Sequence, residues 1–231
     1  MNKKVQAILV LDESGSMGVI KDKTISCVNE YINSLLPQGK MCHITLVKFR
    51  QDDISFICED VPVKDVPKLD YNRYKPNGGT PLLDAVGKTI KATQAQIDKA
   101  KDKPDILFIV MTDGEENSSR EYNQKQIIDM ISEKEKVGWT FVYLGANQDS
   151  WASASGIGYA SRGNVLDFVA SDNGMEKVMS RTIGATAKYF SGRKQFYATH
   201  ALAGHDLDKV SYSTKTFYGK NKKEGGKYGK S

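Results

Sequence analysis

Five side chains that carry oxygen lie just after apolar or glycine-rich stretches of the sequence. Three of them follow the apolar run of residues 5–11 at alternate positions, one follows the apolar run of residues 105–111, and one follows a Gly-Gly pair. The five residues are Asp12, Ser14, Ser16, Thr80 and Asp113. Carboxylates and hydroxyls without His or Cys form the ligand set that a hard divalent cation prefers. The sequence therefore predicts a metal centre built from oxygen atoms.

Mg²⁺ is the expected metal, with Mn²⁺ as the alternative. Mg²⁺ demands a near-octahedral shell at ~2.0–2.1 Å and usually keeps waters beside one or two carboxylates. If the three hydroxyls bind directly and the two carboxylates act mainly through water, much of the charge of the ion stays uncompensated. Such an ion attracts a carboxylate from outside the protein. We therefore expect a protein partner that presents Asp or Glu to the metal.

The elements that must position these residues alternate along the chain. Apolar runs typical of strands alternate with segments in which apolar residues recur every three or four positions. Strands are expected at residues 5–11, 43–49, 54–59, 105–111, 139–144 and 165–169, and helices around residues 25–35, 83–97, 127–131 and 175–190. This alternation predicts an α/β fold with a doubly wound, mostly parallel six-stranded sheet and helices on both faces. In such sheets ligands bind outside the carboxyl ends of the strands, where Asp12 and Asp113 are expected.

One pair of strands departs from the parallel pattern. Gln51-Asp52-Asp53 separates the strands expected at residues 43–49 and 54–59, and so short a polar connection suits a hairpin. A hairpin makes its strands antiparallel, so we expect one short antiparallel edge strand. Residues 61–81 hold four prolines and Gly78-Gly79, which predicts a long loop with at most one helical turn.

The three oxygen-bearing motifs together resemble the von Willebrand factor type A (vWA) family. They are Asp-x-Ser-x-Ser at residues 12–16, Thr80 after a Gly-Gly pair, and Thr-Asp-Gly at residues 112–114. Each motif alone is weak, whereas all three in this order at strand ends are specific, and the resemblance covers about residues 3–190. It implies a Rossmann-like vWA sheet with a metal-ion-dependent adhesion site (MIDAS).

The resemblance also assigns roles at the predicted centre. It implies that Ser14, Ser16 and Thr80 are direct metal ligands and that Asp12 and Asp113 complete the shell, often through water. Residues 115–118 would form part of the rim beside the metal. Because residues 1–4 and the apolar stretch after them do not form a signal peptide, the chain looks more like the intracellular bacterial or phage members of the family than like its extracellular adhesins.

Two other function classes compete with the binding module. An aspartate that closes the first strand beside Mg²⁺ also occurs in phosphoryl-transfer enzymes, where Asp12 would be the nucleophile. That pattern requires a second carboxylate two residues later, and this chain has Ser14 there. Nucleotide binding has no support, because no glycine-rich phosphate-binding motif follows the first strand. The sequence favours a non-catalytic module.

Composition narrows the cellular setting. The longest apolar runs are far shorter than the ~20 residues that a membrane-spanning helix needs, so no membrane association is expected. The three cysteines, Cys27, Cys42 and Cys58, are odd in number and widely spaced, which indicates neither a disulfide framework nor a cysteine zinc site. These observations predict a reducing, cytoplasmic location.

The C-terminal part carries the net charge of +5, because six lysines face one glutamate from Lys215 onward and residues 1–214 sum to zero. We expect a vWA domain at residues 1–190 and a C-terminal extension at residues 191–231 that ends in a mobile Lys/Gly-rich segment. Residues 195–202 and 210–218 have the composition of extra strands. The basic end would either be a solvated tail or make weak nucleic-acid contacts through lysines and interleaved aromatic residues.

Several single residues carry expectations of their own. Met17 is either an exposed apolar contact on the rim of the metal centre or a core residue. Glu115 and Glu116 are expected in a solvated turn, and His43 is expected to be a hydrogen-bonded strand histidine. His200 and His205 lie five positions apart, which suits no second metal site; Met175 and Met179 are expected in the core.

Overall fold

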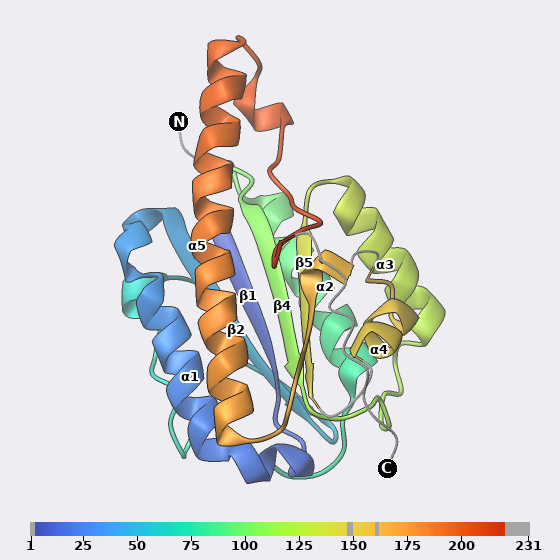
Figure 1. Cartoon of the computed structure of the whole chain (residues 1–231). Coiled ribbons are helices and arrows are strands. Elements are labelled where there is room, and N and C mark those ends of the chain that lie inside the picture. The colour runs from blue at the N-terminus through green and yellow to red at the C-terminus, as the bar shows by residue number, and fades with distance from the viewer. Residues whose placement is uncertain (1–2, 147–149, 160–161, 220–231) are drawn as a thin grey trace, which may run out of the picture.

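The computed structural model describes residues 3–146, 150–159 and 162–219. A six-stranded sheet with the order β3-β2-β1-β4-β5-β6 forms the centre of the protein (Figure 1). The strands are β1 (Val5–Asp12), β2 (Cys42–Arg50), β3 (Asp53–Pro62), β4 (Asp105–Thr112), β5 (Thr140–Ala146) and β6 (Val165–Phe168). Neighbours pair in parallel except β2 and β3, which are antiparallel. The predicted sheet is confirmed, but the edge strand β3 has 10 residues and is not short.

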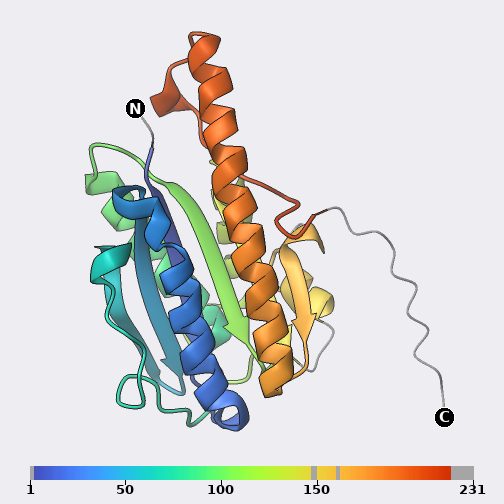
Figure 2. The same ribbon diagram turned by 60° about the vertical axis from the view of Figure 1, so that its left-hand side comes forward.

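Helices cover both faces of this sheet, as predicted (Figures 1 and 2). One face carries α1 (Lys21–Ser34) and α5 (Asp172–Leu202), and the other carries α2 (Leu82–Lys99), α3 (Gln124–Lys136) and α4 (Ser150–Gly156). Each long helix turns an apolar side toward the sheet; in α1 this side contains the buried residues Ile25, Val28 and Ile32. Met175 and Met179 of α5 are buried in the core, as expected.

The two central strands are buried along their whole length. All eight residues of β1 and all eight of β4 are buried. Alternate side chains of β1 point to opposite faces, so Leu9 and Leu11 join the core beneath α1 and α5 while Val10 joins the core on the other face. A continuous apolar run is typical of a parallel strand covered on both sides, which is why residues 105–111 read as a central strand.

Two connections near the predicted metal residues, the β2–β3 turn and the loop over residues 61–81, also match the prediction. Gln51 and Asp52 form the tight turn between β2 and β3, with Gln51 at a φ of 43°, a left-handed conformation uncommon outside glycine. Residues 61–81 are all described and contain one short 3-10 turn, Val63–Asp65, and no longer helix. This long loop ends at the start of α2.

The C-terminal part of the chain corrects two expectations. Helix α5 has 31 residues and runs to Leu202, so the strand expected at residues 195–202 is wrong. Residues 210–218 contain no strand either. The aromatic and branched residues of the first segment have the composition of a strand, but Arg193 and Tyr197 continue the buried side of the helix at helical spacing.

The chain after α5 folds back along that helix. Phe217 is buried in the core beneath α5. Gly192 permits this close approach, because a Cβ at that position would collide with the hydroxyl of Tyr212. Neither the helix nor the packing is interrupted at residue 190, where the sequence analysis places the start of an extension.

A buried polar cluster fixes α5 to the edge of the sheet where β1 and β4 begin, which we call the amino edge. Arg193 Nε donates to Asp105 Oδ2 at 2.5 Å, and its Nη2 donates to the carbonyl of Lys3. Tyr197 Oη donates to Asp105 Oδ1 at 2.6 Å, and the backbone N–H of Tyr212 donates to the same oxygen at 3.2 Å. The buried carboxylate of Asp105 is thus neutralised by a cation of the same chain.

Candidate metal centre

Neighbouring strands bring two of the predicted metal residues to the opposite, carboxyl edge of the sheet. β1 and β4 run in parallel with Leu11 opposite Met111. Asp12 is the last residue of β1, and Asp113 directly follows the last residue of β4. The side chains that follow both strands therefore leave the sheet at the same place, as the sequence predicts.

The first motif folds into a compact turn around Asp12. Ser14 is the N-cap of a 3-10 helix, Gly15–Ile20, and its backbone N–H donates to Asp12 Oδ1 at 2.7 Å. Ser14 Oγ lies 3.2 Å from Ser16 Oγ. Ser16 Oγ in turn donates to Asp113 Oδ1 at 2.6 Å. Alternate positions of the motif thus place three oxygen-bearing side chains beside the second carboxylate.

Thr80 completes the cluster from the loop before α2. A Cβ placed on Gly114 would lie 3.0 Å from Thr80 Oγ1 and 3.7 Å from Ser16 Oγ. The hydroxyls of Thr80 and Ser16 therefore flank the same small space next to Gly114. The structure brings all five predicted residues together.

The spacing of these oxygens fits a small divalent cation. In an octahedral shell with metal–oxygen distances of ~2.0–2.1 Å, adjacent ligand oxygens lie about 2.9 Å apart. The two hydroxyls expected as direct ligands from the first motif, Ser14 Oγ and Ser16 Oγ, lie 3.2 Å apart, which is close to that value. Ser14, Ser16 and Thr80 are thus positioned to hold a cation together with Asp12 and Asp113.

Burial gives the cluster an inner and an outer side. Asp12, Ser14 and Thr80 are buried, whereas Asp113 is partly exposed and Ser16 is exposed. An ion at this place would be held from within the protein and would keep an open coordination position toward solvent.

The two carboxylates lack a compensating positive charge. Burial raises the pKa of Asp12 to about 6, although hydrogen bonds from Thr112 Oγ1 (2.5 Å) and from the Ser14 backbone oppose this rise. Burial also raises the pKa of Asp113. Within the described chain neither carboxylate forms a salt bridge with Lys or Arg. A bound cation would supply the missing charge.

Glu13 supports the centre, and the sequence analysis missed it. Its carboxylate is fully buried and lies 3.1 Å from Lys48 Nζ and 3.4 Å from Arg50 Nε. It also accepts a hydrogen bond from the backbone N–H of Lys75, and its carbonyl accepts one from Asn77 at 2.9 Å. Glu13 therefore fixes the loop that carries Thr80 onto the end of β1. Its position between two predicted metal ligands, Asp12 and Ser14, was the available signal.

Two further side chains hold Thr80 from either side. Asn117 Oδ1 accepts a hydrogen bond from the backbone N–H of Thr80 at 2.7 Å. Gln51, in the β2–β3 turn, donates its backbone N–H to the carbonyl of Gly79 at 2.8 Å and accepts from the Gly79 N–H at 3.1 Å. The hairpin and the loop after β4 thus clamp the Gly-Gly-Thr segment between them.

The loop after β4 corrects one expectation. Glu116 is not in a solvated turn, because its carboxylate accepts hydrogen bonds from Leu83 N at 2.8 Å and from both the N–H (2.7 Å) and the hydroxyl (2.7 Å) of Ser119. It ties this loop to the first turn of α2. Glu115 is exposed, as expected.

One of the two predicted roles of Met17, that of an exposed contact on the rim of the metal centre, is wrong. Met17 is fully buried in the core beneath α1, whereas Val19, two residues later in the same 3-10 helix, is 81% exposed. Two residues span about two-thirds of a turn of a 3-10 helix, so the two side chains point in different directions and Val19 is an exposed apolar residue of this short helix.

The histidines stay outside the metal centre. His43 Nδ1 lies 2.9 Å from the carbonyl and from Oδ1 of Asp60, which confirms a hydrogen-bonded strand histidine. The rings of His200 and His205 are 5.1 Å apart near the end of α5. In the part of the chain that the structure describes, no group of three or more His, Cys, Asp and Glu side chains is suited to a metal. The candidate centre is not a group of this type, because three of its five side chains carry hydroxyls and only two carry carboxylates.

Solved structures with the same architecture share little sequence with this chain. PTMP1 from the mussel byssus is 14% identical with a TM-score of 0.57 over 78% of this chain and 45% of its own. Manganese-loaded TRAP from Plasmodium vivax is 17% identical with a TM-score of 0.53 over 78% and 72%. The pilus adhesin SpaC from Lactobacillus rhamnosus GG is 12% identical with a TM-score of 0.59 over 79% and 30%.

The fold is that of a von Willebrand factor type A domain. Another structure of PTMP1 has zinc in its MIDAS motif, and TRAP is loaded with manganese. The chain spans less than half the length of the mussel protein and about a third of the pilus adhesin, so the likeness concerns the vWA fold alone. No family model and no curated protein matches the sequence.

Proposed function

We propose that this chain is a protein-binding module that acts through a divalent metal ion. The observation that carries the proposal is the convergence of three hydroxyls and two carboxylates at the carboxyl edge of a vWA sheet. The zinc-occupied MIDAS of PTMP1 and the manganese-loaded TRAP support it, because both proteins share this fold.

The proposed metal is Mg²⁺ or Mn²⁺. Ser14, Ser16 and Thr80 bind the ion directly, and the carboxylates of Asp12 and Asp113 complete the shell, mainly through water. When bound, the metal supplies a positive charge that the neutral hydroxyls do not cancel. The ring of oxygen ligands and the absence of His and Cys from the cluster support a hard cation.

The proposed partner is a protein that places an Asp or Glu carboxylate on the open side of the metal. Ser16 and Asp113 line that side. Val19, three residues after Ser16 in the same short helix, is 81% exposed, and Tyr71, whose ring lies 5.0 Å from the Lys21 ammonium, is 57% exposed on the loop before Thr80. An acidic residue flanked by apolar ones therefore fits this rim.

Calorimetric titration of Mg²⁺ and of Mn²⁺ tests the metal step, with wild type and Thr80→Ala side by side. Thr199→Ala, which removes an exposed hydroxyl on α5, is the matched control. We expect at least a tenfold loss of affinity in Thr80→Ala and none in Thr199→Ala. Unchanged affinity in Thr80→Ala would refute the proposed ligand set.

A pull-down from a native-host lysate tests partner capture, in Mg²⁺ and in EDTA. We expect a protein retained by metal-loaded wild type and released by EDTA or by Thr80→Ala. The same material in all lanes would show that the metal centre is not the binding surface.

We also propose that the chain is not an enzyme. The phosphoryl-transfer alternative needs Asp12 as an accessible nucleophile, but its carboxylate is buried and accepts hydrogen bonds from the Ser14 backbone and from Thr112. A phosphatase assay with p-nitrophenyl phosphate and Mg²⁺ tests this, and turnover lost in Asp12→Asn would overturn it.

We also propose that the protein is cytoplasmic and that it is of the intracellular bacterial or phage type. Free thiols at Cys27, Cys42 and Cys58 support a reducing compartment, and burial raises the pKa of Cys42 to about 12, which keeps that thiol unreactive. Among the described residues no helix is long and apolar enough to cross a membrane. Five of the six lysines of the predicted nucleic-acid contact lie in residues 220–231, outside the described residues, whereas the aromatic residue Phe217 is buried in the core and is not available for base stacking.

A further inference from the structure

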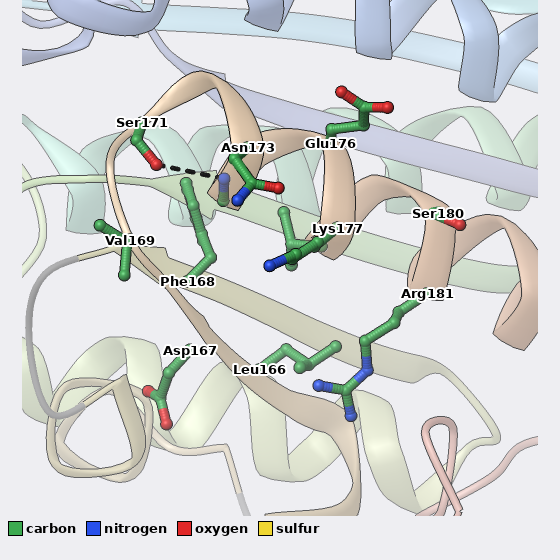
Figure 3. A pocket seen from close by; sticks show the side chains of 12 residues that line it. Leu166, Asp167, Phe168, Val169, Ser171, Asn173, Glu176, Lys177, Ser180 and Arg181 are labelled. Atoms are coloured by element: carbon green, nitrogen blue, oxygen red, sulfur yellow. Dashed lines mark hydrogen bonds between the residues drawn. The ribbon is translucent and has the colours of Figure 1, made fainter.

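A second concave surface, lined by none of the five residues of the candidate metal centre, lies between the edge strand β6 and the first half of α5 (Figure 3). Its volume is about 950 Å³. We call it the β6–α5 groove. Leu166 and Phe168 of β6 and Val178 of α5 form its buried apolar floor, and the exposed Val169 lies at one end.

The charge inside the groove is positive. Lys177 and Arg181 stand on the side of α5 that faces the groove (Figure 3). Within the described residues neither takes part in a salt bridge, and the Arg181 guanidinium lies 6.0 Å from the ring of Tyr218. Both side chains are exposed and thus available to an anionic ligand.

The two acidic residues that border the groove do not cancel this charge. The Glu176 carboxylate lies on the far side of the helix from Lys177 and Arg181 (Figure 3) and pairs with Lys23 at 3.0 Å. Asp167 alternates along β6 with Leu166 and Phe168, whose side chains join the core beneath α5, so Asp167 points to the opposite face of the sheet.

The edge of the sheet gives this groove a second recognition element. Among the residues that the structure describes, β6 has a strand neighbour on one side only, because it is the last strand in the order of the sheet. The outer side of such a strand presents backbone N–H and C=O groups to an added strand. α5 runs along the sheet beside β6, so a strand added there would lie along the helix (Figures 1 and 2).

The spacing of the two cations fits an extended ligand. Lys177 and Arg181 are four helical residues apart, about 6 Å along the axis. Alternate residues of an extended strand are about 6.6–6.8 Å apart. Acidic side chains at alternate positions of an added strand would therefore each meet one cation.

We propose that the β6–α5 groove binds an extended acidic segment of a partner protein, which adds to β6 as a further strand and pairs two alternate carboxylates with Lys177 and Arg181. This site is independent of the metal centre. Charge pairing and backbone hydrogen bonds supply recognition, and the side chains between the acidic ones point to the opposite face of the sheet.

Fluorescence anisotropy with a labelled peptide in which Glu alternates with Thr tests the proposal. The titration is done in EDTA, so that the metal centre does not bind the peptide. We expect binding by wild type, at least a tenfold loss in the double variant Lys177→Gln/Arg181→Gln, and no loss in Lys188→Gln/Lys194→Gln, which removes two exposed lysines of α5 outside the groove. A peptide with Gln in place of Glu should bind at least tenfold more weakly.

Three outcomes would overturn the proposal. The first is equal binding by both double variants. The second is binding that requires Mg²⁺ and is lost in Thr80→Ala, which would instead place the peptide at the metal centre. The third is Lys177- and Arg181-dependent binding of a single-stranded oligonucleotide but not of the peptide. Slower hydrogen exchange of the β6 amides on peptide addition would support strand addition, and unchanged exchange would overturn it.

Discussion

Asp105 and Asp12 are buried carboxylates at opposite ends of two neighbouring strands, and among the described residues only Asp105 is paired with a cation. Asp105, at the amino edge, pairs with Arg193 at 2.5 Å and accepts hydrogen bonds from Tyr197 and from the backbone of Tyr212. Asp12, at the carboxyl edge, accepts hydrogen bonds only from neutral groups among the described residues.

This difference separates a structural carboxylate from one that we propose to act in metal binding. The amino edge contains its own cation and holds the long helix α5 in place. At the carboxyl edge, loops bring together a set of oxygens whose negative charge is not paired with a Lys or Arg among the described residues. A vWA sheet can therefore be stabilised at one edge while the other edge stays available for a metal ion.

The largest expected effect is at the amino edge. Arg193→Met keeps most of the buried side-chain volume but leaves the Asp105 carboxylate without a cation, which should lower the free energy of unfolding by about 3–5 kcal/mol. Urea denaturation in EDTA measures this loss. Lys194→Met, at the exposed neighbouring position, should change stability by less than about 0.5 kcal/mol. Similar stabilities for the two variants would break the comparison.

The charged form of Asp12, which has no cation beside it among the described residues, should destabilise the metal-free protein, so its stability should depend on pH. The folded-state pKa of about 6 exceeds the ordinary value of 3.8, so between these values the folded state binds more protons than the unfolded state. Stability in EDTA should fall by up to about 3 kcal/mol as pH rises from 4 to 6. Asp12→Asn should remove this fall and, above pH 6, be more stable than wild type.

Denaturation between pH 4 and pH 8 in EDTA measures this effect. The Asn amide can accept from Ser14 N and donate to Thr112 Oγ1, so the variant keeps both hydrogen-bond partners. If Asp12→Asn shows the same pH profile as wild type, burial of the Asp12 charge is not what destabilises the metal-free protein.

Metal should stabilise wild type more than Thr80→Ala. Mg²⁺ at a hundredfold excess over its Kd should add about 2.7 kcal/mol to the free energy of unfolding. Thr80→Ala, which should bind Mg²⁺ at least tenfold more weakly, should keep no more than about 1.4 kcal/mol of this gain, while its stability in EDTA falls by no more than about 1 kcal/mol. Thermal unfolding with and without Mg²⁺ checks both values, and equal stabilisation of the variant would mean that Thr80 is not a ligand.

The smallest expected effect is at Glu13, which acts on the metal through its neighbours. Glu13→Gln removes the anion that neutralises Lys48 and Arg50 and loosens the loop before Thr80, so Mg²⁺ affinity should fall about tenfold, or about 1.4 kcal/mol. Glu115→Gln removes an equal charge from an exposed position near the centre and is the control. Equal losses in both variants would indicate a long-range charge effect rather than positioning.

The sequence sufficed to predict the sheet, the hairpin and the five clustered residues. An apolar run such as residues 105–111 is stable in an α/β fold as a central strand that is covered on both faces. Motifs at the carboxyl ends of neighbouring parallel strands lie at the same edge of the sheet, whatever the conformation of the loops between the strands. These features depend on patterns within short segments. They could therefore be read without any knowledge of distant contacts.

The features that were missed depend on contacts between distant residues. Residues 195–202 have a strand-like composition, but Tyr197 finds its partner in Asp105, 92 positions earlier, and the segment stays helical. Glu116 is one of two adjacent glutamates, and only its contacts with the start of α2 distinguish it from the exposed Glu115. Local composition contains no information about such partners.

Gly114 has a consequence for how this centre could change over generations. Its φ is outside the left-handed region, so alanine is compatible with the backbone there. One methyl group at this position would sit 3.0 Å from Thr80 Oγ1 and 3.7 Å from Ser16 Oγ, and would intrude on the space of the ion. A single nucleotide change from glycine to alanine could thus silence the module with every ligand retained, and a single reversion would restore it.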